Sequence, residues 1–228
     1  MIIERTSKSV AVKQQLTIQE GQKVEYVILH DGEQAQFSRQ FDVEKDAELK
    51  LITILLGGQQ SDFDLEINLR GAGAIAKQYL LVMNNEQQIT DARLATYHRV
   101  GQTTSSTVVR KVLDGQASGS LHGLIHIAPD AQLSDGELYD AVYLLSDAAR
   151  NRSIPSLEIN ADDVKARHGS AQSKLKEEDL LYLQSRGIAY PQAKNILVDG
   201  FAARVYEQIS DPDVKREVRE LISHKVYA

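Results

Sequence analysis

The stretch 157-LEINADDVKARHGS-170 decides how the rest of the chain is interpreted. It opens like a strand, with Leu157 and Ile159 alternating with polar residues, and it then becomes rich in charge. It also contains a single histidine, His168. This histidine is a metal ligand, a catalytic base or an ordinary residue where a strand runs into a loop. The sequence on either side is needed to choose among these roles.

The sequence before this stretch, from about residue 8 to 166, predicts many short strands and almost no helix. Apolar and polar residues alternate in segments such as 24–28, 65–69 and 121–127. Pairs or triplets typical of turns separate such segments, at Asp31-Gly32, Gly57-Gly58, Asp114-Gly115 and Ser134-Asp135-Gly136. Small-residue turns recur at spacings of 14 to 38 residues, so there is no strict short repeat. The recurrence fits a β-solenoid, but a β-sandwich would give a similar pattern. The pattern alone leaves both folds open.

The sequence after about residue 172 predicts three short helices. The first lies in the run 176–187, with acidic residues in its first turn and Gly187 just past its end. Pro191 suits the first position of the second helix, and Asp211-Pro212 suits the N-cap and first position of the third. Each of the last two helices has one expected apolar face, formed by Ala193, Ile196, Leu197, Gly200, Phe201, Val205 and Ile209, and by Val214, Val218, Leu221 and Ile222.

The composition excludes several classes of function. The 228 residues carry a formal net charge of −6, which argues against binding to nucleic acid. There is no cysteine, so the chain has no disulfide, no thiolate nucleophile and no cysteine ligand for a metal. No apolar run is long enough to span a membrane, and the first ten residues contain no export signal. We therefore expect a cytoplasmic protein without a membrane partner.

The motifs that would indicate an enzyme are missing. The sequence has neither a phosphate-binding G-x-x-x-x-G-K-[ST] loop nor a G-x-S-x-G nucleophile turn. His122 and His126 have the spacing of a helical metal pair, but on the strand predicted here their side chains would lie about 13 Å apart. Asp162 and Asp163 raise the alternative of a carbohydrate-active solenoid, although adjacent strand residues point to opposite faces. We expect no catalytic residues.

A family resemblance adds what spacing cannot. The run from Pro155 to Gly169, PSLEINADDVKARHG, together with LYLQSRGI at 181–188, resembles the C-terminal signature of the SufB/SufD family of the SUF iron–sulfur cluster assembly machinery. The segments 144–147 and 196–202 also fit. The resemblance is specific over about residues 119–210, and the N-terminal hundred residues match only in general character.

The resemblance implies a mainly β protein, with a right-handed parallel β-helix core at 1–170 and a small α-helical domain at 171–228. It also implies that two such cores pair through their solenoids, as a homodimer or as a heterodimer with a SufB or SufD paralogue. The C-terminal helices would dock a SufC-like ABC-type ATPase, which agrees with the absence of a phosphate-binding loop from this chain.

The resemblance is closer to SufD than to SufB. Gly169 follows the histidine where SufB-like sequences tend to carry glutamate, and a rough alignment places Asp140 where SufB has a cysteine. Full-length members are longer and begin with a helical region, so the sequence is expected to be a short form. Without cysteine it could hold only a transient iron or iron–sulfur species, at a subunit interface.

Four residues are candidates for functional roles. The matching histidine of SufD-like proteins implies a metal role at the interface for His168, where Lys165 and Arg167 would favour the neutral imidazole. The alternative is a histidine that hydrogen-bonds a turn. Tyr182, Arg186 and Phe201 are the expected partner-binding residues, and packing of the helices on the solenoid explains them equally well. A second functional class is an interaction protein of the same fold without a role in cluster assembly.

Overall fold

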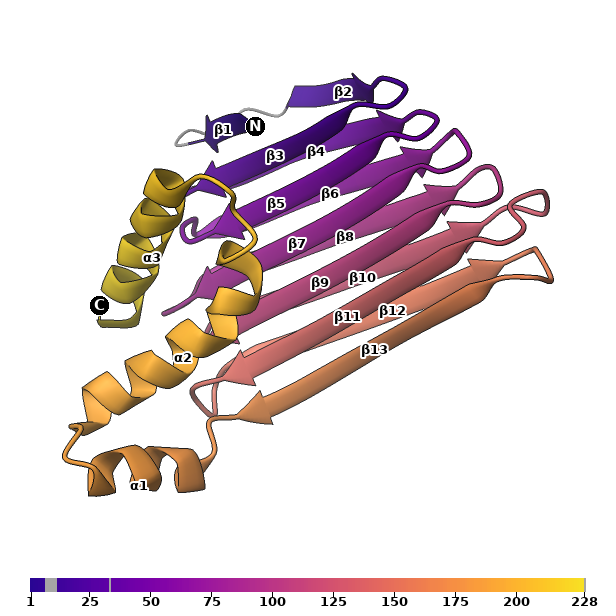
Figure 1. Cartoon of the computed structure of the whole chain (residues 1–228). Coiled ribbons are helices and arrows are strands. Elements are labelled where there is room, and N and C mark those ends of the chain that lie inside the picture. Colours follow the sequence, from indigo (N-terminus) through magenta and orange to yellow (C-terminus); the bar gives the residue numbers. More distant parts are fainter. Residues whose placement is uncertain (7–11, 33, 228) are drawn as a thin grey trace.

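The computed structural model describes residues 1–6, 12–32 and 34–227, and it shows thirteen strands wound into a parallel β-solenoid, followed by three helices (Figure 1). The solenoid predicted from the resemblance is therefore confirmed, and the sandwich is wrong. The strands are β1 Ile2–Thr6, β2 Val12–Ile18, β3 Lys23–His30, β4 Gln34–Val43, β5 Glu48–Leu55, β6 Gln60–Leu69, β7 Ile75–Asn84, β8 Ile89–His98, β9 Thr104–Leu113, β10 Ser118–Ile127, β11 Asp135–Leu144, β12 Arg150–Ile159 and β13 Lys165–Lys174.

The strands form two parallel sheets, because each turn of the solenoid contributes one strand to each sheet. The odd-numbered strands form a seven-stranded sheet in the order β1-β3-β5-β7-β9-β11-β13, and the even-numbered strands form a six-stranded sheet from β2 to β12. The residues Glu48, Ile75, Thr104, Asp135 and Lys165 lie side by side in the first sheet, 27 to 31 residues apart along the chain. Because the turns of the solenoid differ in length, the sequence shows no fixed period.

The connections that lead from each even-numbered strand to the next odd-numbered strand stack on each other, as the strands do. Asp46, Gly73, Gln102 and Leu133 all have positive φ angles, and the amides of the first three donate to carbonyls of the next connection at 2.9 to 3.0 Å. Gly71 has no room for a side chain, since a Cβ there would lie 2.1 Å from the backbone nitrogen of Lys45. These close approaches explain the small residues in the turns. The turn predicted at 134–136 is too long, because β11 already begins at Asp135.

The space between the two sheets is filled by side chains from alternate strand positions. Phe41, Phe63, Leu65 and Ile67 are almost completely buried there, and the rings of Phe37 and Phe63 stack with centroids 5.0 Å apart. Removing this apolar surface from water stabilises the solenoid by about 25 cal/mol for each Å² buried.

The three helices are α1 Glu177–Ser185, α2 Tyr190–Tyr206 and α3 Pro212–Tyr227, and all three were predicted. Pro191 lies in the first turn of α2, and Gly187 ends α1 with a φ of +84°. The Asp211 carboxylate accepts hydrogen bonds from the amides of Asp213 and Val214 at 2.9 and 3.1 Å, as expected of an N-cap.

The face that α2 presents to the sheet differs from the prediction. Ile196 and Gly200 are exposed, whereas Val198, Ala202 and Tyr206 are buried, and Ile209 follows the helix. Ala193 and Val205 are buried as predicted, and the position of the sheet, which the helical pattern cannot show, decides which of the other residues are covered. The predicted face of α3 is confirmed, since Val214, Val218 and Ile222 are buried and Leu221 packs beside them.

The second apolar core lies outside the solenoid, where α2 and α3 cover the seven-stranded sheet (Figure 1). Ile52 and Ile54 of β5 and Leu81 and Met83 of β7 point outward and are buried by these helices. This explains the apolar run at 80–83 and the run at 51–56, which only Thr53 interrupts, because both faces of the strands are covered there. Ion pairs at the margin include Arg5 with Glu217, whose Nη2 and Oε2 atoms lie 2.8 Å apart.

The end of the solenoid extends further than predicted. Glu158 and Ile159 end β12 and were expected to form the last turn, but β13 follows and continues to Lys174. Asp162 and Asp163 lie in the connection between these strands and not on a strand. The division at 170/171 into two domains remains a prediction, and it falls within β13. No helix in the described part of the chain is long and apolar enough to cross a membrane.

Candidate functional site

The last two strands form the exposed end of the solenoid, which we call the terminal turn (β12 and β13). Each of them lies at the border of its sheet and is hydrogen-bonded to a strand on one side only within the described residues. Most of their side chains are exposed or half-buried. An edge strand presents free backbone N–H and C=O groups, with which a strand of another chain can form hydrogen bonds and so extend the sheet.

His168 lies in β13 and not at a junction between strand and loop. It is in register with Leu138, which points into the space between the sheets and is 2% exposed. His168 therefore also faces inward, but it is exposed because no further turn of the described chain covers it. The imidazole is accessible at the open end of the solenoid.

The cations expected near His168 are arranged differently. Arg167 points to the opposite face of β13, as adjacent strand residues must. Its Nε atom lies 3.1 Å from Glu137 Oε2, and its Nη2 atom lies 3.7 Å from Asp135 Oδ1. Glu137 and Asp135 therefore already balance the charge of Arg167. These carboxylates, with Glu137 first, raise the pKa of Arg167.

Asp140 occupies the position that the resemblance aligned with the SufB cysteine, and it takes part in a buried ion pair. Its carboxylate lies 3.1 Å from Lys111 Nζ, and both side chains are at most 1% exposed. Ser153 hydrogen-bonds both groups. Burial lowers the pKa of Lys111, while Asp140 opposes that shift. This pair lies between the sheets, with Asp140 on β11, the strand next to β13, and Lys111 on β9, the following strand of the same sheet.

The histidine pair at 122 and 126 lies on strand β10, as predicted. His126 lies 3.6 Å from Glu158, and its ring is 5.6 Å from the ring of Tyr97. No group of three or more histidine, aspartate or glutamate side chains in the described residues is arranged to hold a metal ion. A metal role for His168 would therefore need ligands from another molecule.

The three predicted partner-binding residues have two different environments. Tyr182 and Arg186 are exposed on α1, with the guanidinium carbon 5.4 Å from the centre of the tyrosine ring. Phe201 is half-buried, and its ring stacks on Tyr143 of β11 with centroids 4.0 Å apart. Phe201 thus packs on the solenoid, which is the second role that the sequence allowed. A partner contact through Phe201 remains a prediction.

Tyr182 is one of four exposed apolar side chains of α1 and α2, of which the sequence did not single out Leu181 and Tyr190. We call this group the α1–α2 patch, and its members with their exposed fractions are Leu181 64%, Tyr182 59%, Tyr190 52% and Ile196 48%. In Figure 1, α1 lies beyond the edge of the sheets, next to the start of α2. Leu180 is the one buried residue of α1, so this helix offers most of its apolar surface to solvent.

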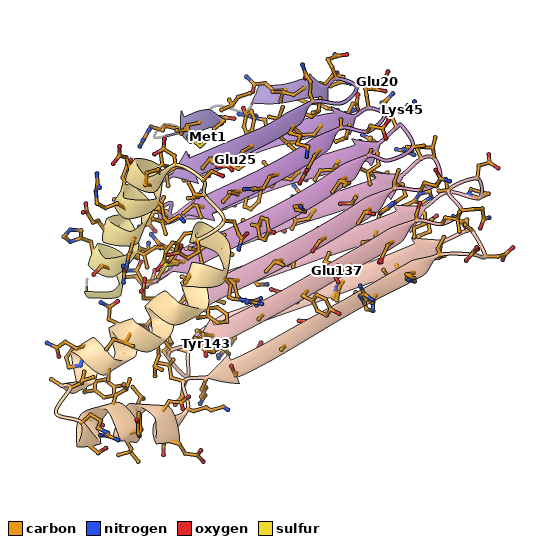
Figure 2. All side chains as sticks on the ribbon, viewed as in Figure 1. Met1, Glu20, Glu25, Lys45, Glu137 and Tyr143 are labelled. Carbon is orange, nitrogen blue, oxygen red and sulfur yellow. The ribbon has the colours of Figure 1, made fainter. Side chains whose placement is uncertain are left out.

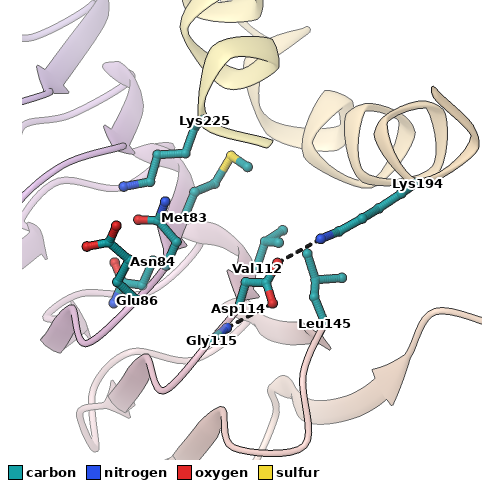
Figure 3. Close-up of a pocket in the computed structure, with 10 residues that line it drawn as sticks. Met83, Asn84, Glu86, Val112, Asp114, Gly115, Leu145, Lys194 and Lys225 are labelled. Atoms are coloured by element: carbon teal, nitrogen blue, oxygen red, sulfur yellow. Dashed lines mark hydrogen bonds and ion pairs between the residues drawn. The ribbon is translucent and has the colours of Figure 1, made fainter. Parts of the chain in front are cut away.

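A pocket lies where α2 and α3 meet the turns of the solenoid (Figure 3). Lys194 Nζ lies 2.7 Å from Asp114 Oδ2, and Lys225 Nζ donates to Gln88 Oε1 at 2.7 Å. Burial lowers the pKa of Lys225 to about 8, with the charge of Glu86 opposing the shift. Both lysines hold a helix against the solenoid. We therefore assign the pocket to the packing of the helices.

The fold and this site define a class of protein, a parallel β-solenoid with an exposed terminal turn and helices that present an apolar patch. Comparison with known proteins identifies the family. The family model described as "SUF system FeS cluster assembly, SufBD core domain" matches residues 3–201. The chain therefore belongs to the SufBD family of the SUF iron–sulfur cluster assembly system.

The curated proteins that the chain resembles are also named as iron–sulfur cluster assembly proteins. The chain is 28% identical to the iron–sulfur cluster assembly protein SufD of Escherichia coli K12 over 174 residues, which cover 76% of this chain and 41% of that protein. It is 30% identical to an iron–sulfur cluster assembly SufBD family protein of Mycobacterium tuberculosis over 190 residues, with coverage of 80% and 48%. The chain thus matches less than half the length of these relatives.

Proposed function

We propose that this protein is a non-enzymatic, SufD-like component of iron–sulfur cluster assembly. It would pair with a second SufBD-type solenoid through its terminal turn and dock a SufC-like ABC-type ATPase through its C-terminal helices. Membership of the SufBD family supports the general role. The observation that carries the docking proposal is the α1–α2 patch, because its four large apolar side chains are about half exposed or more.

Pairing through the terminal turn is supported by the backbone of β12 and β13. These strands end their sheets, and a strand of a second molecule could continue either sheet. The second molecule would then cover the open end of the solenoid where His168 faces inward. A homodimer and a heterodimer with a paralogue both satisfy this geometry.

A role for His168 in handling iron depends on this pairing. A neutral imidazole is a suitable ligand for iron, but one histidine cannot hold the ion alone. The other ligands of a transient iron or iron–sulfur species, which is the cargo of the assembly, would come from the partner. In this chain, Asp140 and Lys111 neutralise each other at the position aligned with the SufB cysteine.

Co-expression with the ABC-type ATPase of the same genome tests the proposal. The mass of the complex, measured by light scattering with and without ATP, should correspond to two SufBD-type chains and two ATPase chains. If no partner solenoid is supplied, a complex with two copies of this chain supports a homodimer. A protein that pairs but ignores the ATPase would favour the second functional class, an interaction protein without a role in cluster assembly.

The role of His168 is tested on the same complex. His168→Ala should reduce the iron bound per complex after anaerobic incubation with ferrous iron and sulfide, while the mass of the complex stays unchanged. His122→Ala is the matched control, because His122 is also an exposed strand histidine but lies outside the terminal turn. Equal iron binding by both variants would rule out a metal role for His168.

A further inference from the structure

A second site lies on the outer face of the seven-stranded sheet, between the end of α2 and the terminal turn. It is a shallow hollow whose lining includes Arg110 of β9, Tyr139 of β11, Gly169 of β13 and Arg204 of α2, together with the acidic residues Glu137 and Asp140 of β11. Figure 2 shows Tyr143 close to α2 and Glu137 further along the same strand, away from the helices, and the hollow lies on this part of the sheet. We call it the two-arginine hollow.

Arg110 is fixed in place without an acidic partner. Its guanidinium carbon lies 5.3 Å from the centre of the Phe201 ring, which itself stacks on Tyr143. One nitrogen, Nη1, donates to the backbone carbonyl of Val109 at 2.9 Å. No carboxylate of the described residues forms an ion pair with Arg110. A guanidinium has five N–H donors, so most of its hydrogen-bonding capacity is unused by the contacts found here.

Arg204 adds a second positive charge to the same hollow. It is exposed, lies in the last turn of α2, and forms no ion pair within the described part of the chain. Burial and then the charge of Arg204 lower the pKa of Arg110, while Asp140 and Tyr143 oppose that shift. The two guanidinium groups therefore repel each other, and an anion between them would remove that repulsion.

The nearby carboxylates are already engaged. Glu137 accepts hydrogen bonds from Arg167 at 3.1 Å and from Ser106 at 2.8 Å. Asp140 is buried and paired with Lys111 on the inner side of the sheet. Both carboxylates of the lining therefore have a cationic partner, whereas Arg110 and Arg204 have no ion pair within the described residues.

The walls of the hollow suit a small ligand. A Cβ atom at Gly169 would lie 3.2 Å from Cδ1 of Tyr139, so the glycine allows the tyrosine ring to lie close to β13. The residues that share the outer face of β13 with Gly169 include Lys165 and Arg167 but no acid. A second copy of this strand, added beside β13, would bring no carboxylate to the hollow.

We propose that the two-arginine hollow binds a small free oxyanion, with its phosphate or carboxylate group held between the forks of Arg110 and Arg204. Arginine forks bind both groups through paired, charge-assisted hydrogen bonds. The hydroxyl group of Tyr139, which lies on the same face of the sheet as Arg110, is a further polar group of the lining. This site is separate from the α1–α2 patch and does not depend on the proposed function.

Calorimetric titration of the full chain tests this proposal, with inorganic phosphate and succinate as separate probes at constant ionic strength. At least one probe should bind, and Arg204→Gln should weaken its binding about tenfold or more, which is the loss expected for a charge-assisted hydrogen bond. Binding of phosphate alone or succinate alone identifies the anionic group. Because Arg204 is exposed, this variant should fold normally.

Two further variants sharpen the result. Arg110→Lys keeps the charge but loses the fork, so it should also weaken binding. Arg216→Gln is the control, because it removes one exposed positive charge from α3, where the one ion pair of Arg216 within the described residues is with Asp213, three residues away. Equal weakening by Arg216→Gln and Arg204→Gln would reduce the effect to net charge and overturn the proposal. The absence of binding by both probes at about 10 mM, roughly ten times a millimolar dissociation constant, would overturn it as well.

Discussion

His98 is a buried residue whose role could not be predicted from the sequence, in which it stands alone. It is 0% exposed, and its ring nitrogens lie 2.7 Å from Thr103 Oγ1 and 2.8 Å from Ser105 Oγ. Thr103 is in turn 2.9 Å from Ser134 Oγ. Burial, and to a lesser extent His126, lowers the pKa of His98 to about 4. The neutral imidazole therefore belongs to a polar network inside the solenoid.

This environment predicts that acid destabilises the fold through His98. The unfolded chain binds a proton near pH 6.5 whereas the folded chain does so near pH 4, so stability decreases as the pH falls between these values. The free energy of unfolding, measured with urea, should drop by about 2 kcal/mol between pH 7.5 and 5 from this group. His98→Asn should lack that part of the pH dependence. The exposed His122→Asn should retain it, and identical pH profiles for both variants would contradict the assignment.

The buried pair of Lys111 and Asp140 predicts a strong asymmetry between single and double substitutions. Lys111→Met leaves a carboxylate buried without its cation and should lower the free energy of unfolding by about 3–5 kcal/mol. Adding Asp140→Leu removes the stranded charge and should recover most of that loss. Urea unfolding of both variants at pH 7 measures the difference. A double variant no more stable than the single one would show that the pair is not a charge-compensated unit.

At the scale of elements, the helices were predictable where local chemistry determines them. Asp211 caps α3 and Gly187 ends α1, and both signals act within a few residues. The buried face of α2 was not predictable, because the sheet beneath it decides whether Val198 or Ile196 is covered. Strand β13 was missed for a related reason. It belongs to the last turn, which nothing in the described chain covers, so it lacks the apolar alternation that marks the other strands.

The candidate site shows the same division. The resemblance selected His168, but its position required knowledge of the register between β11 and β13. Leu181 and Tyr182 are adjacent in the sequence, and large apolar residues in the middle of a helix are usually buried. Their exposure follows from the position of α1 beyond the sheets (Figure 1). No periodicity distinguishes an apolar residue that packs within its own chain from one that a partner would cover.

The α1–α2 patch gives a prediction about docking that is independent of stability. Leu181→Asp should change the free energy of unfolding by no more than about 0.5 kcal/mol, since Leu181 is an exposed side chain. The same variant should recover much less ATPase when the two proteins are co-purified. Glu178→Gln, an exposed change on the same helix, is the control. Undiminished ATPase recovery with Leu181→Asp would place the docking surface elsewhere.

At the scale of the whole molecule, the outer core ties the last helix to the first turns of the solenoid. Val218 and Ile222 of α3 are completely buried with residues of β3, β5 and β7, although more than a hundred residues separate them in the sequence. The Arg5–Glu217 ion pair and the contact between Lys50 and Ser210 reinforce this connection. The helices and the solenoid should therefore lose their structure in a single transition.

This cooperativity is testable with one substitution in the outer core. Ile222→Ala removes a completely buried side chain and should lower the free energy of unfolding by about 2–5 kcal/mol. Because the core is shared, the helical signal at 222 nm and the near-ultraviolet signal of Tyr26, which is buried in the solenoid, should move to the same lower temperature. Ile196→Ala, in the exposed patch, should shift neither signal. A loss of the helical signal at a temperature where the tyrosine signal persists would show instead that the helices unfold from the solenoid as a separate unit.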